Sequence, residues 1–169
     1  MKIISLILIS FALTGCAATN SRTESNRSEF VQKMEVLHVE LVLEQWHFAA
    51  SQGLFDMYFG LMTPDAIFLG TDESERWDID QFKGYAREPF ADGDGWTYTP
   101  RKDGRFVVLS DDEQTAWVDE LLDNEKYGVL RGTSVLVKVG DDWKIAHYSL
   151  TFLVPNDKAK GVVELIAED

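Results

Sequence analysis

The stretch that decides the fold is residues 129–154, VLRGTSVLVKVGDDWKIAHYSLTFLV. Apolar and polar residues alternate on both sides of Gly140-Asp141-Asp142, which is typical of two antiparallel strands joined by a tight turn. Two earlier segments, Trp96–Leu109 and Thr115–Asp123, alternate in the same way and are followed by short polar links. We therefore predict a meander of four antiparallel strands in the C-terminal part of the chain.

The part of the chain before this meander has helical patterns. Apolar residues recur at helical spacing over residues 28–53, and a second short helix is predicted at residues 54–61. A third helix begins at Asp78, whose side chain is a good N-cap, and runs to about Phe90. Between these helices, residues 66–70 predict a short strand. Helices clustered before an antiparallel meander predict an α+β fold in which the helices cover one face of a curved sheet.

The N-terminal residues resemble the export signal of bacterial lipoproteins. The apolar run Ile3–Leu13 is too short to span a bilayer as a mature helix, and Leu13-Thr14-Gly15-Cys16 resembles the lipobox. The resemblance implies cleavage before Cys16 and lipidation of its thiol. No aspartate follows the cysteine, so we expect a lipid-anchored protein of the bacterial cell envelope, at the outer membrane and facing the periplasm. The alternative is a cleaved soluble signal peptide with an incidental cysteine.

These patterns divide the chain into four parts. We expect a signal peptide at residues 1–15, a lipidated flexible tether at 16–27, one folded domain at 28–156 and a C-terminal extension at 157–169. The tether segment is small and polar, so it buries little apolar area. Cys16 is the only cysteine, and its lipidation would leave no thiol for a disulfide or a metal site.

Charge and missing motifs exclude several classes of function. The net charge is −13, from 16 Lys and Arg against 29 Asp and Glu, without a basic block. Such a chain repels polynucleotides, so we expect no nucleic-acid partner. The sequence contains no HExxH, GxSxG, Walker or GxGxxG motif. With three histidines and no available thiol, we expect no metal and no cofactor.

Several segments in a fixed order carry a resemblance to a known family. They are PDAIFLGTDESERW (Pro64–Trp77), GWTY (Gly95–Tyr98), AWVDE (Ala116–Glu120), RGTSVL (Arg131–Leu136) and WKIAHYSLTFLVPN (Trp143–Asn156). Together they resemble a SnoaL-like domain of the nuclear transport factor 2-like superfamily. The resemblance implies a cone-shaped, curved antiparallel sheet packed against three N-terminal helices, with a pocket between them. It implies no single activity, because the superfamily includes isomerases, dehydratases, cyclases, hydrolases and proteins that only bind or scaffold.

Three ionisable residues of the meander are candidates for an acid-base site. If the strand register puts Asp119, Arg131 and His147 together on the concave face, an acid, a permanent cation and a titratable imidazole meet in the pocket. The alternative is an ion pair of Asp119 with Arg131, with His147 hydrogen-bonded beside it, that only stabilises the barrel floor. Paired buried ions are commoner than active sites, which favours the structural interpretation.

Five aromatic residues are candidates for the wall of a hydrophobic-ligand pocket: Trp77, Tyr85, Trp96, Tyr98 and Trp117. Core packing explains them almost as well. We therefore expect a lipid-anchored domain that binds a small, mainly apolar molecule or serves as an interaction module. One alternative is a cofactor-independent isomerase, dehydratase or hydrolase in which Asp119 or His147 is the base and Arg131 holds an anionic group. Another is a structural envelope lipoprotein that forms a homodimer through the outer face of the sheet.

Overall fold

The computed structural model describes residues 15–91, 93 and 95–167. The predicted signal peptide, apart from Gly15, lies outside these residues, as do Asp92 and Asp94 of the turn before the meander. The chain forms two units, Met1–Met34 and Glu35–Asp169, and the second contains the sheet. In the described part of the chain, no helix is both long and apolar enough to cross a membrane.

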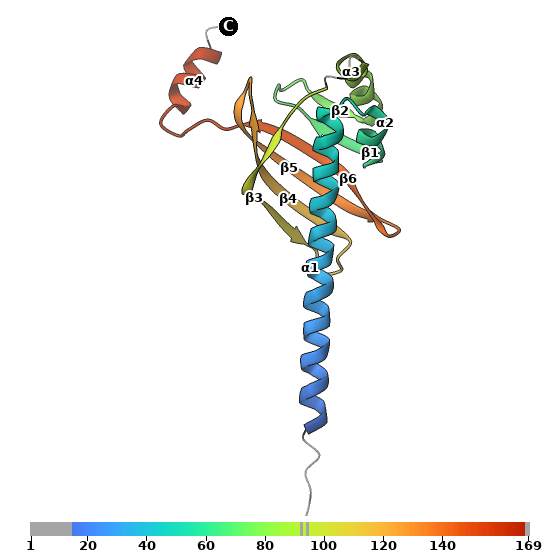
Figure 1. The fold of residues 1–169 in the computed structure, drawn as a ribbon. Helices are drawn as coiled ribbons and strands as arrows, with labels where there is room; N and C mark the ends of the chain where they lie inside the picture. Colours follow the sequence, from blue (N-terminus) through green and yellow to red (C-terminus); the bar gives the residue numbers. More distant parts are fainter. Residues whose placement is uncertain (1–14, 92, 94, 168–169) are drawn as a thin grey trace, which may run out of the picture. The chain divides into compact units, whose positions relative to one another are not determined.

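The described residues form four helices and six strands, whose arrangement Figure 1 shows. In chain order they are α1 (Gly15–Ser51), α2 (Phe55–Gly60), β1 (Met62–Leu69), β2 (Arg76–Asp78), α3 (Ile79–Ala91), β3 (Thr99–Leu109), β4 (Thr115–Asn124), β5 (Gly128–Val139), β6 (Asp142–Phe152) and α4 (Ala159–Ile166). The predicted α+β class is confirmed. The short strand β2 and helix α4, which lies in the predicted C-terminal extension, were not anticipated.

The six strands form one mixed sheet in the order β2-β1-β6-β5-β4-β3. Strands β3 to β6 are the predicted meander, and each pairs antiparallel with the next. β1, however, pairs in parallel with β6, so the expectation of a wholly antiparallel sheet is wrong at this position. A parallel pair needs a long connection between its strands, and here α3 and the first three strands of the meander lie between β1 and β6 in sequence.

Helix α1 begins earlier than the sequence pattern suggests. We expected a flexible segment up to Arg27 and a helix from Ser28, whereas the helix begins at Gly15. After Gly15 no glycine or proline occurs before Gly53. No residue therefore breaks the helix, which is held by packing near its C-terminal end. The small polar residues that led us to predict a flexible segment lower the helix propensity only weakly.

The N-terminus of α3 is capped as predicted. Asp78 Oδ1 accepts hydrogen bonds from the backbone N–H groups of Asp80 and Gln81, at 3.0 and 2.9 Å. Gln81 Oε1 in turn accepts one from the Asp78 N–H at 3.0 Å. This reciprocal capping box fixes the point at which β2 ends and α3 begins. Because Trp77 lies in β2 and Tyr85 in α3, this junction also influences how the two aromatic side chains are oriented.

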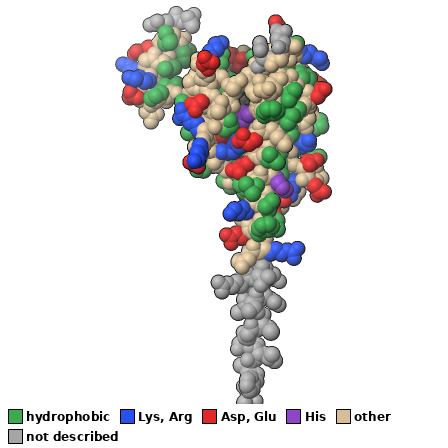
Figure 2. Space-filling view, in the orientation of Figure 1, with side chains coloured by type: hydrophobic (Ala, Val, Ile, Leu, Met, Phe, Trp, Pro, Cys, Tyr) green, Lys and Arg blue, Asp and Glu red, His purple; other side chains and the backbone are tan. Residues whose placement is uncertain are grey.

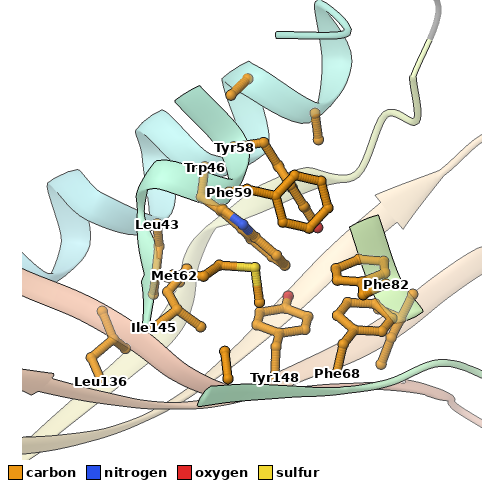
Figure 3. Packing of buried hydrophobic residues seen from close by; sticks show 14 of the residues in the cluster. Leu43, Trp46, Tyr58, Phe59, Met62, Phe68, Phe82, Leu136, Ile145 and Tyr148 are labelled. Atoms are coloured by element: carbon orange, nitrogen blue, oxygen red, sulfur yellow. The ribbon is translucent and has the colours of Figure 1, made fainter. Parts of the chain in front are cut away.

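The hydrophobic core lies between the helices and one face of the sheet (Figure 3). The Trp46 ring of α1 stacks on Tyr58 of α2, with centroids 4.6 Å apart, and contacts Tyr148 of β6 at 4.5 Å. Phe82 of α3 stacks on Phe68 of β1 at 4.1 Å. Helices α1, α2 and α3 therefore each contribute an aromatic side chain to a continuous layer above the sheet, which fills the centre of the space between the two layers.

A β-bulge in β6 changes which residues face the core. Pairing with β5 is regular up to Val135 opposite His147, and then Leu136 lies opposite Ile145, so β6 contains one extra residue. Ile145 is buried on the core side, as is Tyr148, three positions further on. Because side chains alternate strictly in a regular strand, an odd spacing between two inward residues requires such a bulge.

The outer face of the sheet carries exposed apolar side chains. Phe106 and Val108 of β3 are 62% and 61% exposed, and Trp117 of β4 is 50% exposed. Acidic and basic side chains are interspersed on the face of the molecule shown in Figure 2, without a patch of a single sign. This agrees with the absence of a basic block in the sequence.

Candidate functional site

The three ionisable residues predicted for the site lie on one face of the sheet, but it is the outer face. Asp119 is paired with Thr133 across β4 and β5, and Val135 is paired with His147 across β5 and β6. Asp119 and Arg131 are exposed and His147 is half-buried. The expected placement of Asp119, Arg131 and His147 on the concave face is therefore wrong.

Two local features place these residues outside. In β4 the buried phase is occupied by Val118 and Leu122, so Asp119 points away from the core. In β6 the bulge reverses the phase after Ile145, so that His147 does not follow Ile145 to the inner face. A shift of one residue moves a side chain to the opposite side of the sheet.

The inner face instead carries a buried carboxylate, Glu120, which is 1% exposed. Its Oε1 lies 2.7 Å from His47 Nε2 and accepts a hydrogen bond from the Tyr148 hydroxyl at 2.9 Å. Its Oε2 accepts two hydrogen bonds from the Arg105 guanidinium, at 2.8 and 2.7 Å. Arg105 also donates to Glu44 at 2.7 Å. Both oxygens of the buried carboxylate are thus satisfied, as burial of a charge requires.

The partners of Glu120 keep it ionised. Burial would raise the pKa of the carboxyl group, but the hydrogen bond with His47 and the charges of His47 and Arg105 outweigh it and lower the pKa to about 2. Burial and the adjacent Glu120 raise the pKa of Tyr148 well above its ordinary value, so the phenol stays protonated. This network holds α1, β3, β4 and β6 together, and a fully paired carboxylate with so low a pKa is a poor base.

The network predicts how stability depends on pH. Because the folded-state pKa of Glu120 lies below the ordinary 4.5, its contribution is complete above about pH 4.5 and is lost as the pH falls towards 2. The difference corresponds to roughly 3 kcal/mol at neutral pH. Thermal melts of wild type and Glu120→Gln between pH 7 and pH 2 measure this. The difference in melting temperature between the two proteins should shrink as the pH falls from about 4.5 towards 2. A difference that stayed the same down to pH 2 would contradict the assignment.

The sequence contains a signal for Glu120 that we missed. In β4 the positions two residues apart are Ala116, Val118, Glu120 and Leu122, three of them apolar. An acidic residue in the apolar phase of an alternating strand indicates a buried, paired carboxylate. Its partners come from distant parts of the sequence, and no spacing rule links them to β4.

A cavity of about 380 Å³ opens near α3, away from the Glu120 network. It is bordered by the loop after β1, by β2 and α3, by the segment before β3 and by the turn between β4 and β5. Four of the five predicted aromatic residues line it: Trp77, Tyr85, Trp96 and Tyr98. The fifth, Trp117, is on the outer face, where it lines a separate groove with Asp119 and His147. Phe68, Phe82 and Tyr127 complete the aromatic lining among the described residues.

The rings of this cavity are held in place by stacking. Trp77 stacks on Tyr85 with a centroid distance of 4.5 Å and on Phe82 at 5.7 Å. Phe82 is 1% exposed and also stacks on Trp96 at 5.9 Å. The inner rings are thus anchored in the core while Tyr85, 51% exposed, is open to solvent. Such a preformed apolar wall loses little entropy when a flat molecule packs against it.

Polar groups are placed at several points around the cavity. Glu75 Oε2 accepts hydrogen bonds from the N–H groups of Thr71 and Asp72, at 2.8 and 3.2 Å, which fixes the carboxylate. Burial, followed by the neighbouring tyrosines and Glu75, raises the pKa of Tyr98 to about 12. Burial and Glu75 also raise the pKa of Tyr85. Both phenols are therefore neutral at pH 7 and available as hydrogen-bond donors.

The cavity lining suits binding better than acid-base catalysis. Among the described residues that line it, Glu75 is the only carboxylate and none is a histidine. Over the described residues, no three side chains of His, Cys, Asp or Glu are close enough together to hold a metal ion. The arrangement can hold a small molecule between rings and orient it through a few polar atoms.

Comparison with known proteins assigns the family. Residues 39–155, more than half of the chain, match the family model for the SnoaL-like domain. The chain therefore belongs to the SnoaL-like domain family, and the predicted resemblance is confirmed at that level. None of the curated proteins matches this sequence.

Solved structures agree with the fold. A domain of unknown function with a cystatin-like fold from Nostoc punctiforme has a TM-score of 0.65 and 12% identity, covering 79% of this chain and 86% of its own. A putative dehydratase from the NTF2-like family of Streptomyces avermitilis has a TM-score of 0.61 and 14% identity, covering 73% and 99%. At these identities the likeness shows the fold and leaves the activity open.

Proposed function

We propose that this domain binds a small, mainly apolar molecule in the aromatic cavity. The observation that carries the proposal is the aromatic wall of Trp77, Tyr85 and Trp96, in which Trp77 stacks on Tyr85 and Trp96 is tilted against Tyr85, and which borders about 380 Å³ of space. A hollow of this volume lined mainly by aromatic side chains, on a domain that already has a full core, is typical of a ligand site.

The enzyme alternative has less support. An isomerase, dehydratase or hydrolase that uses Asp119 and His147 would need them beside the ligand, but they lie on the opposite face of the sheet from the cavity. The buried acid that the inner face does contain, Glu120, has both oxygens occupied by partners. Ligand binding therefore accounts for the arrangement of the cavity, and it requires no catalytic side chain beside the ligand.

Calorimetric titration of the full-length protein with 2-naphthol, used as a flat apolar probe, tests binding in the cavity. We expect saturable binding at one site that is weakened at least tenfold by Trp96→Leu. Trp117→Leu is the matched control, because Trp117 lies on the outer face, and it should leave the affinity unchanged. Equal affinities of wild type and Trp96→Leu would refute the proposed site.

We further propose that the domain is anchored to a membrane through lipid on Cys16, in the bacterial cell envelope. The support is the lipobox-like Leu13-Thr14-Gly15-Cys16 behind a short apolar run. Several acyl chains anchor durably, where one alone binds only marginally. Cys16→Ser should therefore move the protein from the membrane fraction to the soluble fraction or stall its processing. A normally cleaved Cys16→Ser protein that remains membrane-bound would count against lipid anchoring.

A further inference from the structure

The aromatic cavity combines ring faces with a fixed carboxylate. Its lining includes five Trp and Tyr rings together with Glu75. The face of an aromatic ring is the negative end of its quadrupole, so it attracts a cation placed over it. Several such rings beside a carboxylate therefore favour a cation covered with methyl groups over a neutral hydrocarbon of the same size, wherever a ring face is left open to the ligand.

The carboxylate is built into the wall. Two backbone N–H groups, of Thr71 and Asp72, hold Glu75 Oε2. Gly70 leaves room for the same carboxylate, because a Cβ at that position would collide with it. Glu75 is therefore held in one conformation beside the rings, and it does not have to be ordered when a ligand arrives.

The electrostatic effect of Glu75 extends into the cavity. Beyond the effect of burial, its negative charge raises the pKa of both Tyr85 and Tyr98, and the charge of Lys126 offsets a smaller part of this at Tyr85. Burial disfavours an ion of either charge, whereas the negative charge of Glu75 disfavours only anions and favours cations. The same field that disfavours a phenolate favours a positively charged ligand.

An ammonium group already lies against one ring of the wall. Lys126 Nζ is 4.7 Å from the centroid of the Tyr127 ring, and both residues line the cavity. The Lys126 side chain is exposed, so water and salt screen its repulsion of a second cation. One ring of the cavity lining, Tyr127, thus already has an alkylammonium within the distance of a cation–π contact.

We propose that the ligand of this cavity is a small organic cation, a quaternary or methylated ammonium ion whose methyl groups pack on Trp77, Tyr85 and Trp96 and whose charge is balanced by Glu75. This inference rests on the proposed function, because it specifies the ligand of the same cavity. Such a cation is apolar at its surface and charged beneath it, which matches both components of the wall.

The test compares two probes of the same shape. Choline and 3,3-dimethyl-1-butanol differ in that a positive nitrogen replaces a neutral carbon. Calorimetric titration of the full-length protein in a nonionic detergent should give choline a dissociation constant at least tenfold lower. Glu75→Gln keeps an oxygen to accept the two N–H bonds, and it should weaken choline at least threefold while leaving the alcohol unchanged. Glu73→Gln, an exposed acid outside the lining, is the control and should change neither affinity.

The outcomes separate the two proposals. Equal affinities for choline and the alcohol would overturn the cation inference and support an apolar site. Binding of 2-naphthol with no binding of choline would also overturn it. If neither choline nor 2-naphthol binds, both this inference and the proposed function fail. Equal weakening of choline by Glu73→Gln and Glu75→Gln would show general attraction to an acidic protein, and would overturn the assignment to this cavity.

Discussion

Replacement of Glu120 by glutamine should lower the free energy of unfolding at neutral pH by about 3–5 kcal/mol. The substitution keeps the shape of the side chain but removes the charge that pairs with Arg105 and His47. Arg105, 9% exposed, would then have Glu44 as its remaining acidic partner. In thermal melts the midpoint should fall by roughly 6–20 °C.

The neighbouring residue provides the matched control for this prediction. Asp119→Asn is the same chemical change one position earlier, on the outer face, where Asp119 is exposed. It should change the free energy of unfolding by less than about 0.5 kcal/mol. If Glu120→Gln and Asp119→Asn had the same melting temperature, Glu120 would not be the carboxylate that stabilises this sheet.

Phe82→Ala should also lower the free energy of unfolding by about 3–5 kcal/mol. Phe82 is 1% exposed and contacts rings from three other elements, including Phe68 at 4.1 Å and Phe59 at 5.4 Å. Its removal leaves a space that these stacked rings cannot fill without leaving their positions. Urea denaturation, with the midpoint and slope measured together, gives the loss.

Phe106→Ala is the control for the change in the core. It removes the same side chain from the outer face, where Phe106 is 62% exposed, and should cost less than about 1 kcal/mol in the isolated protein. A loss as large as that of Phe82→Ala would mean that the outer face is covered in solution.

The sequence predicted the elements that have local signals. The N-cap at Asp78 and the alternation in β4 and β5 depend on residues within a few positions of one another, and both were found. The parallel pairing of β1 with β6 depends on contacts between distant segments, for which a single sequence contains no signal. β2 is too short for a periodic pattern to be visible.

The candidate site was predicted only in part, because some of its features depend on residue type and others on contacts between distant strands. Trp77, Tyr85 and Trp96 line the cavity as expected, because their residue type alone made them candidates for a ligand pocket. The ionisable residues were assigned to the wrong face because their assignment required the register of three strands at once. A bulge of one residue in β6 was enough to place His147 outside.

The bulge in β6 divides the strand into two halves with opposite alternation of inward and outward side chains. Residues before it face the core at odd positions such as Trp143 and Ile145, and residues after it at even positions such as Tyr148 and Leu150. An alignment of relatives that places no gap here would compare core residues with surface residues along half the strand. Without the bulge, a regular strand of the same length would bring the His147 imidazole inside and put the Tyr148 ring in water. Deletion of Ala146, the extra residue, would instead leave both side chains on their present faces in a regular strand, so the faces of this strand depend on one added residue.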